Sequence, residues 1–415
     1  MLDAIRHPQR ARWPTPAPAT APFPARAVYR AHRWRGATAV LLVLLMFVAG
    51  VGLAWDIRWH AAVGRDDFWS PPHLLIYSGV AATGLVCLVA ALVTSYQGWR
   101  RQPVAIARSV RPLGLFYAPL GVVIAGAGMT VVLLAAPFDN LWHELYGIDV
   151  ALWAPFHLMG LIGGGLAWLG AVYLTAAQAV HARRQGWARP WLLGLDAWQW
   201  LTLFALSSLY AGLATIAQPG AVQFPTTELG PVHFATYPVL LALATTFVSV
   251  AAVRTTGRPG AASAVVALYI ARQAALGVFV PWAIRTTVAA QGLAYRLPDG
   301  APEFPVYQVA IAGALLAPAL LIDLIAWWTG DELAHRRPAL VAGLLSGVPL
   351  FALGIGTTFT LYQHLPALQV PPEILLPGPP TGHAVIGALP LTLAAGTLGA
   401  GLGSGLGAVL RLNER

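Results

Sequence analysis

Ten stretches of apolar residues, separated by short polar segments, run along the chain between residues 38 and 409. An α-helix needs about 20 apolar residues to cross the hydrocarbon core of a bilayer, and each stretch is close to that length or longer. The stretches cover residues 38–56, 73–96, 114–136, 153–179, 196–217, 232–253, 262–284, 306–328, 339–361 and 383–409. The pattern predicts an all-α polytopic integral membrane protein of about ten transmembrane helices, with the lipid bilayer as its first partner.

The polar segments between these stretches alternate in arginine content. Arginine is frequent in residues 1–37, in every second connecting segment and in the tail, whereas the other segments hold only Arg58, Arg65, Arg285 and Arg296. Arginine-rich segments remain on the cytoplasmic side of a membrane. We therefore predict cytoplasmic termini and five helical hairpins that close on the outer side, which we take to be the periplasmic side of a bacterial inner membrane.

A recurring phrase supports the division into five hairpin repeats. Each outer segment re-enters the membrane through a proline that is followed within a few residues by a histidine or, once, by a glutamine. The chain then divides into a cytoplasmic N-terminal segment 1–37, two related hairpins 38–179, the remaining bundle 180–409 and a cytoplasmic tail 410–415.

Composition supports the membrane assignment and argues against two other classes of site. Hydrophobic residues make up 57% of the chain and charged residues only 10%, against about 25% charged residues in soluble domains. The net charge of +9 comes from the cytoplasmic arginines, so it indicates topology rather than a nucleic-acid-binding surface. The single cysteine, Cys87, lies in an apolar stretch and leaves no disulfide or thiolate site.

The outer segments are acidic, although the chain as a whole is basic. The carboxylates in these segments and at their rims are Asp56, Asp66, Asp67, Asp139, Glu144, Asp149, Glu228, Asp299, Glu303 and Glu373. The outer histidines are His60, His73, His143, His157, His233, His364 and His383, whereas His7, His32, His181 and His335 are scattered over the cytoplasmic side. A negative surface that is rich in imidazoles attracts cations and offers metal ligands.

The first two hairpins share a motif that supplies one carboxylate and two imidazoles. Asp-x-x-Trp-His occurs at Asp56–His60 and again at Asp139–His143, and a second histidine, His73 or His157, opens the next helix. Residues four apart lie on one face of a helix, so each motif predicts two ligands on one helix and a third on its neighbour. Three such donors leave coordination positions open, as in catalytic or exchangeable transition-metal sites.

Copper is the expected metal, with zinc or iron as alternatives. Imidazole and carboxylate donors suit all three metals, copper binds imidazole sites most tightly, and only four methionines and one cysteine are present to supply sulfur. A single histidine at a helix end more often caps the helix than binds a metal, but recurrence of the whole set in both hairpins favours metal binding. His233 and His383 lack the upstream motif, so we expect capping or supporting roles for them, and His364 carries less weight still.

The first hairpin resembles the membrane subunit that carries the membrane copper ligands in the copper membrane monooxygenases, the particulate methane and ammonia monooxygenases. The family's pattern of Asp, Trp-His, Arg-Asp, an aromatic residue, Pro and His is matched, at the same offsets, by Asp56, Trp59-His60, Arg65-Asp66, Trp69, Pro71 and His73. The resemblance implies that Asp56, His60 and His73 are copper ligands. More loosely, it implies a second copy made of Asp139, His143 and His157, where one extra residue precedes the last histidine and the Arg-Asp pair is missing.

This resemblance extends over the first two hairpins at most. Members of the family have fewer helices and a single such motif, and they work in a complex with two other subunits, one of which carries a soluble copper domain that has no counterpart in this sequence. By this resemblance we expect a copper-dependent monooxygenase of small apolar substrates, or a subunit of one that needs additional membrane subunits. The substrate is expected to arrive through the bilayer, with Asp66 or Asp67 relaying protons as catalytic residues.

The remaining bundle holds fewer chemical features. Asp196, Asp323 and Arg272 are ionisable residues within apolar stretches, which makes each a functional candidate by default, and a buried pair between Asp323 and Arg272 is conceivable. A run of glycines in the last stretch predicts that this helix packs closely on a neighbour. These glycines are Gly396, Gly399, Gly403 and Gly407.

Three other functions are open to the same residues. A cation or proton transporter would use the triads as transient sites under alternating access, and would need a path of ionisable residues through the membrane. A non-catalytic accessory subunit of a larger complex would bind no stoichiometric metal. Haem ligation fits less well, because histidines that hold a porphyrin usually lie within the membrane on facing helices, whereas these gather at helix ends beside acids.

Overall fold

The computed structural model describes residues 25–64, 68–146, 152–297, 300–330, 336–363 and 377–412. Within these residues, ten helical segments are long and apolar enough to cross a membrane. They are α1 (Ala25–Ala62), α2 (Pro71–Trp99), α4 (Leu120–Tyr146), α5 (Pro155–Arg184), α6 (Ala197–Ala217), α8 (Thr236–Thr256), α9 (Ala261–Gln291), α10 (Val306–Ala314) with α11 (Leu316–Thr329), α12 (Arg336–Gln363) and α13 (Gly382–Leu412). The expected all-α polytopic architecture is confirmed.

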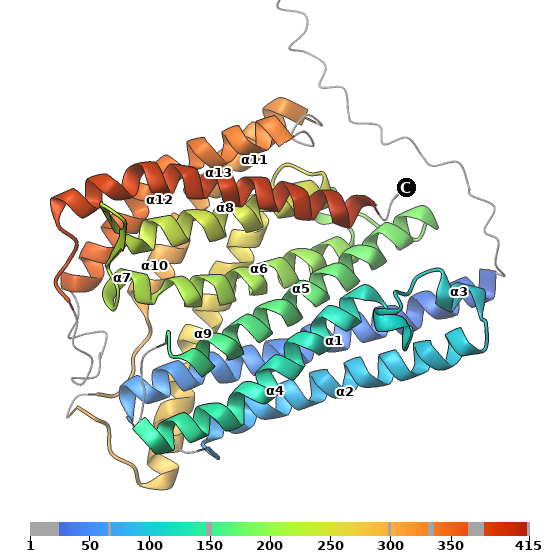
Figure 1. Ribbon diagram of the computed structural model, residues 1–415, viewed down its shortest axis with the longest axis horizontal. Coiled ribbons are helices and arrows are strands. Elements are labelled where there is room, and N and C mark those ends of the chain that lie inside the picture. Colours follow the sequence, from blue (N-terminus) through green and yellow to red (C-terminus); the bar gives the residue numbers. More distant parts are fainter. Residues whose placement is uncertain are drawn as a thin grey trace, which may run out of the picture.

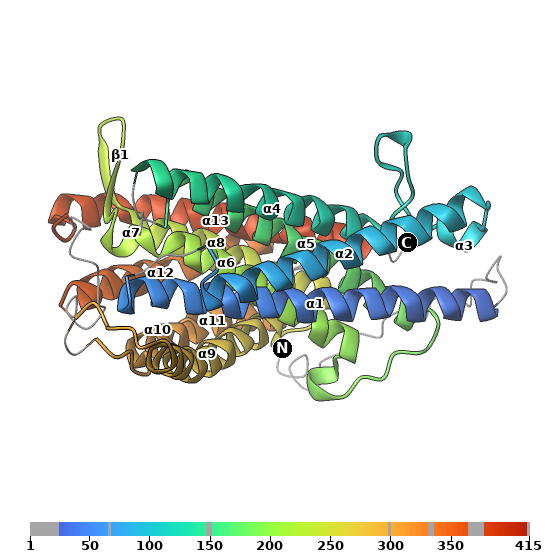
Figure 2. The same cartoon turned by 90° about the horizontal axis from the view of Figure 1, so that it is seen from below.

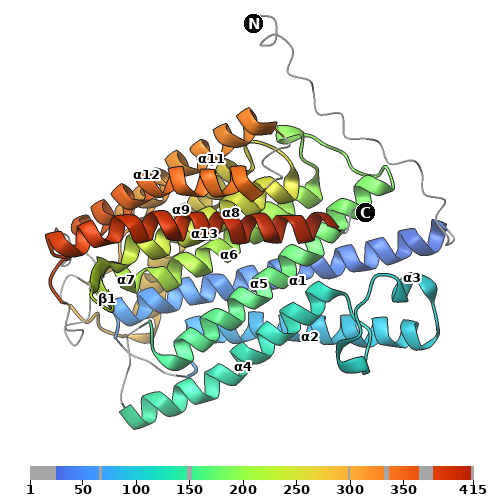
Figure 3. The same cartoon turned by 45° about the horizontal axis from the view of Figure 1, so that its top comes forward.

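The helices pack as neighbouring antiparallel pairs, and α8 is enclosed by α6, α9, α11, α12 and α13 within its half of the bundle (Figure 1). The pairs α1–α2 and α4–α5 lie side by side and form one half of the bundle, since α2 contacts α4 and α1 contacts α5 (Figures 1 and 2). The helix α13 lies across α8 and α12 in the other half (Figure 3). Because α8 is covered from several sides, it is the most deeply buried of the spanning helices.

Several helices are longer than the apolar stretches that predicted them. The stretch 38–56 became α1, which extends from Ala25 to Ala62, and the stretch 114–136 became α4, which continues through Pro137 to Tyr146. Polar residues at a helix end satisfy their backbone hydrogen bonds as well as apolar ones do, but they leave no mark in a hydrophobic pattern. These extensions matter because they carry His60 in the first metal motif and both Asp139 and His143 in the second.

The apolar stretch 306–328 is broken into two helices. The chain forms α10, breaks at Leu315 and continues as α11. Pro318 is the cause, because it has no backbone N–H to donate to the carbonyl of Ala314 four residues earlier, and its ring crowds that carbonyl. Together the two helices still have the length of one span, Val306–Thr329.

A β-hairpin stands where the sequence predicted the start of the sixth helix at residue 232. Strands β1 (Thr226–Leu229) and β2 (Val232–Ala235) pair antiparallel, with Thr226 opposite Ala235 and Leu229 opposite Val232. Gly230 in the two-residue turn has a φ of 58°, a conformation that glycine adopts without strain. The helix α8 begins only at Thr236, so the predicted boundary was wrong by one short hairpin.

Candidate metal centre

The first triad joins the end of α1 to the start of α2. Asp56 and His60 lie one turn apart on α1, as predicted, and His73 lies in the first turn of α2, two residues after Pro71. The Nε2 atom of His73 is 3.1 Å from Oδ1 of Asp56, and the Nδ1 atom of His60 is 3.6 Å from the same oxygen. All three side chains are largely buried, with 14–15% of their surface exposed.

Hydrogen bonding sets the tautomer of His60. Its Nδ1 lies 2.9 Å from the backbone carbonyl of Asp56, which only accepts hydrogen bonds. In the neutral ring Nδ1 must therefore carry the proton, which leaves the lone pair on Nε2. A histidine that donates one ring nitrogen to a carbonyl and presents the other is oriented as metal-binding histidines usually are.

The second triad repeats this arrangement between α4 and α5. Asp139 and His143 lie on α4 and His157 on the first turn of α5. Distances to the Asp139 carboxylate are 3.3 Å from His157 Nε2 and 3.8 Å from His143 Nε2. One ligand atom from each residue can be chosen so that all three lie within 4.8 Å of one another. This triad is thus compact enough to hold a single ion.

Both triads contain a buried carboxylate oxygen that accepts no hydrogen bond from the described residues. In each case it is Oδ1, of Asp56 and of Asp139. The short approaches of His73 and His157 to these oxygens have ion-pair distances without the angles of a hydrogen bond. A buried carboxylate without a compensating donor is costly, and a cation held jointly by the carboxylate and the two imidazoles would compensate it. The residues present fit a transition metal by this observation and by their donor types.

Aromatic side chains surround both triads. The ring of His73 stacks on Tyr77, with centroids 5.7 Å apart and planes at 28°, and Trp59 beside His60 is only 2% exposed. At the second triad, Phe138 stacks on Phe156 at 5.7 Å, on the residues that adjoin Asp139 and His157. These ring contacts link the helix ends that carry the triads.

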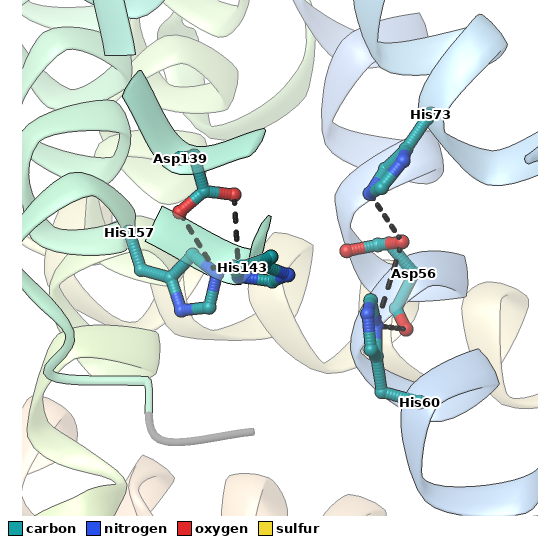
Figure 4. A network of polar contacts seen from close by, with 6 residues as sticks. All are labelled: Asp56, His60, His73, Asp139, His143 and His157. Atoms are coloured by element: carbon teal, nitrogen blue, oxygen red, sulfur yellow. Dashed lines mark hydrogen bonds and ion pairs between the residues drawn. The ribbon is translucent and has the colours of Figure 1, made fainter. Parts of the chain in front are cut away.

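The two triads lie at the same end of the bundle as separate groups (Figure 4). Figure 4 shows polar contacts that connect the residues within each triad and draws none from one triad to the other. The neighbouring positions of their helix pairs follow from the contacts between α2 and α4 and between α1 and α5. Of the two, the second triad alone brings one ligand atom from each residue within 4.8 Å of the others; the first holds the same three donor types in a more open arrangement.

The other outer-side residues that the sequence singled out do not join the triads among the described residues. Asp66, Asp67 and His364 lie outside the described residues, so the proposed proton relay stays a prediction. His233 does not cap a helix, because it lies on β2, is exposed and pairs with Glu228 at 3.2 Å. His383 is exposed in the first turn of α13.

The ionisable residues of the remaining bundle turn out to be mainly helix caps. Asp196 caps α6, since its carboxylate accepts from the backbone N–H groups of Trp198 and Gln199. Asp323 does not pair with Arg272; its carboxylate accepts hydrogen bonds from the start of α9 instead. Arg272 lies on α9 beside Tyr269. The transporter hypothesis needed these residues as a path, and two of the three are occupied with capping.

Sequence reasoning missed one group at the opposite end of the bundle. His32 and His181 are not scattered, because their rings lie 4.9 Å apart. They come from α1 and α5, which are not consecutive helices, and no spacing in the sequence indicates that these two helices touch.

Comparisons with known proteins add no relative. No family model matches the chain, and neither the curated proteins nor the solved structures that were searched include a match.

Proposed function

We propose that this chain is a membrane metalloprotein with two transition-metal sites, Asp56/His60/His73 and Asp139/His143/His157, and that the metal is copper. The observation that carries the proposal is the repetition of the same three donors around a buried carboxylate oxygen at neighbouring helix pairs. If the histidines only capped helices, one such group could still arise by chance. Two groups with the same three donors in the same places are better explained by metal binding.

The donor types favour copper among the candidate ions. Each site offers two imidazoles and one carboxylate, and copper has the highest affinity of the divalent first-row metals for such donors. Zinc and iron accept the same ligands, so selectivity rests on affinity and supply. Bound copper would supply one-electron redox chemistry at coordination positions that the three protein donors leave open.

We propose, as the finer function, oxidation of a small apolar substrate, by the resemblance of the first hairpin to the ligand-bearing membrane subunit of the copper membrane monooxygenases. The surroundings of the triads suit a substrate that enters from lipid. Leu74, Phe138 and Leu141 are each adjacent in sequence to a triad residue or within one turn of it, and each exposes 47–49% of its surface. These side chains offer an apolar route from the bilayer to the donors, while Trp59 and Tyr77 exclude water from the first site.

Metal content of the purified protein tests the first part of the proposal. We expect about two copper ions per chain by mass spectrometry in detergent, one ion in His60→Ala, one in His143→Ala and none in the double variant. His233→Ala is the matched control, because it removes an exposed outer histidine that pairs with Glu228 on the β-hairpin. Absence of metal after attempted loading, or an unchanged content in the double variant, would refute the proposed sites.

Oxygenase activity needs a separate assay. Copper-loaded protein in nanodiscs, supplied with a quinol reductant and isotopically labelled oxygen, is expected to place label in the hydroxylated product of a short alkane. If both metals are retained and no label is incorporated, the chain is a metalloprotein without this activity. Uptake of copper into sealed vesicles then becomes the next measurement, since it reports transport.

A further inference from the structure

A second polar cluster lies at the end of the bundle opposite the triads. His32 on α1 and His181 on α5 bring their rings to 4.9 Å, and Trp187 contacts both rings at 5.1 and 5.5 Å. His32 and Asp56 are separated by 24 residues of α1, or roughly 36 Å of helix. His32 is 9% exposed and His181 is 4% exposed. We call these histidines, with Arg35, Arg108 and Arg184, the arginine–histidine cluster.

The hydrogen bond between Arg108 and His181 fixes the state of the His181 ring. Nη2 of Arg108 lies 2.6 Å from Nδ1 of His181. A guanidinium donates and stays protonated, so Nδ1 must accept, and the neutral ring carries its proton on Nε2. Nε2 of His181 and Nδ1 of His32 are buried, and neither has a hydrogen-bond partner among the described residues. The cluster thus presents a buried N–H donor that no described group accepts.

Arg35 holds the segment that carries Arg108. It is 8% exposed, and its Nη2 donates to the carbonyl of Ala105 at 3.3 Å and to Oγ of Ser109 at 3.4 Å. Both acceptors flank Arg108 in the segment formed by α3 (Pro103–Ile106) and the residues after it. Arg35 thus ties the segment that carries Arg108 to α1, and the bond from Arg108 to Nδ1 of His181 orients its guanidinium.

The charge of the cluster is one-sided. Among the described residues, the charged or titratable groups that act on His181 are Arg108, His32, Arg35 and Arg184, and none of these four is a carboxylate. Burial and the nearby charge of Arg184 lower the pKa of Arg108. The charged group that acts on His32 is again Arg108. Positive charges in a partly buried place are unfavourable without an anion, and they exclude a metal ion.

We propose that the arginine–histidine cluster binds a phosphate group, with the headgroup of an anionic phospholipid as the first source. Arg108 and Arg184 reach the surface and offer charge-assisted hydrogen bonds to phosphate oxygens, and the Nε2–H of His181 provides a neutral donor behind them. The aromatic residues around the cluster, Trp187 and Tyr29, whose rings are 5.3 Å apart, are typical of the headgroup level of a membrane. Basic pockets between spanning helices bind lipid phosphates in this way.

Lipid binding to the full-length protein tests the proposal. Native mass spectrometry of the protein, titrated with phosphatidylglycerol, is expected to show one tightly bound lipid, and phosphatidylcholine to bind far more weakly. Arg108→Gln is expected to weaken phosphatidylglycerol binding about ten-fold, the loss that goes with one charge-assisted hydrogen bond. Arg100→Gln is the matched control, because Arg100 is an exposed arginine near the same end whose guanidinium bonds to Tyr96 of its own helix.

Further measurements distinguish a bound lipid from free phosphate, and a variant that does not bind from one that does not fold. If millimolar inorganic phosphate, but not chloride at equal ionic strength, displaces the lipid or binds without it, the free anion is the ligand. Arg184→Gln, at an exposed helix end, replaces Arg108→Gln if the latter does not fold, and it is expected to weaken binding in the same direction. Binding of phosphatidylglycerol that is equal in the wild type, Arg184→Gln and Arg100→Gln, or equal to phosphatidylcholine and unaffected by phosphate, would overturn the proposal. Metal content is expected to be unchanged in all these variants.

Discussion

The glycines of α13 fall into two classes, according to what a methyl group would meet in place of a hydrogen. At Gly403 it would overlap the carbonyl oxygen of Phe247 on α8, and at Gly399 it would overlap that of Leu243. At Gly405, on the same helix, nothing lies within 4 Å. The backbones of α8 and α13 therefore approach closely along one face only, as expected for spanning helices with small residues at the interface.

Gly403→Ala is expected to lower the free energy of unfolding by about 1–3 kcal/mol, the usual range for overpacking a tight interface. Gly405→Ala is the matched control and is expected to leave it unchanged or to raise it by up to about 1 kcal/mol, since alanine favours the helix more than glycine does. Thermal unfolding of both variants in the same detergent measures the difference. Equal midpoints would contradict the close contact of α8 with α13.

Residues near one another in sequence were the ones whose contacts could be predicted. Asp56 and His60 share a helix face by their spacing, and a short loop returns His73 beside them. The pair His32–His181 could not be predicted, because it depends on contact between α1 and α5, which are separated by two spanning helices. The structure brings the residues of each predicted triad near one another, while their role as metal ligands stays a prediction.

Among the helices, α9 is capped by a residue of another element. Asp323 on α11 accepts hydrogen bonds from the backbone N–H groups of Ala262 at 3.1 Å and Ser263 at 2.8 Å, and from Oγ of Ser263 at 2.6 Å. The residue before α9 is Gly260, which has no side chain to cap with. A buried acid within a spanning helix thus serves the start of a neighbouring helix, so its presence alone did not indicate a transport path.

Asp323→Ala is expected to lower the free energy of unfolding by about 1–3 kcal/mol, because it leaves buried backbone donors without an acceptor. Arg272→Gln combined with it is expected to be additive within about 0.5 kcal/mol, since Ala262 and Arg272 are separated by roughly 15 Å of helix. Denaturation of the two single variants and the double variant gives the coupling energy. A coupling energy above about 1 kcal/mol would contradict this result and support an ion pair between Asp323 and Arg272, as the sequence suggested.

Hydrophobic patterns located the helices but not their breaks and ends. Such a pattern records which residues suit lipid. Proline counts as one residue among others in it, so it does not reveal that the missing N–H of Pro318 divides α10 from α11. It also does not distinguish the first residues of a helix from a short strand, which is why Val232–Ala235 was predicted as helix and forms β2. The ends of α1 and α4, which hold the metal donors, lie in such regions.

For the whole molecule, the described ends of the chain and the two triads lie at opposite ends of the bundle. The start of α1 and the end of α13 are together at one end, and the triads are at the other (Figure 1). The number of spanning helices, ten in the described residues, requires this relation. Which end faces the cytoplasm is predicted by arginine content alone.

Cysteine labelling measures that orientation. The native Cys87 is buried, so a Cys87→Ala background can carry one reporter at a time. Glu228→Cys, in the exposed hairpin near the triad end, is expected to react with a membrane-impermeant maleimide in cells with an opened outer membrane. Arg189→Cys, exposed after α5, is expected to react only after the inner membrane is permeabilised. The reverse pattern would invert the assigned sides.

The repeated unit, a pair of helices, has a consequence for the side of the membrane on which the second triad lies. A chain that enters and leaves a bilayer on the same side can be copied in tandem without turning the copy over. Had one helix or three been duplicated, the copied donors would have emerged on the opposite face. Because α1–α2 and α4–α5 are each a complete pair, Asp139, His143 and His157 lie on the same side of the membrane as Asp56, His60 and His73.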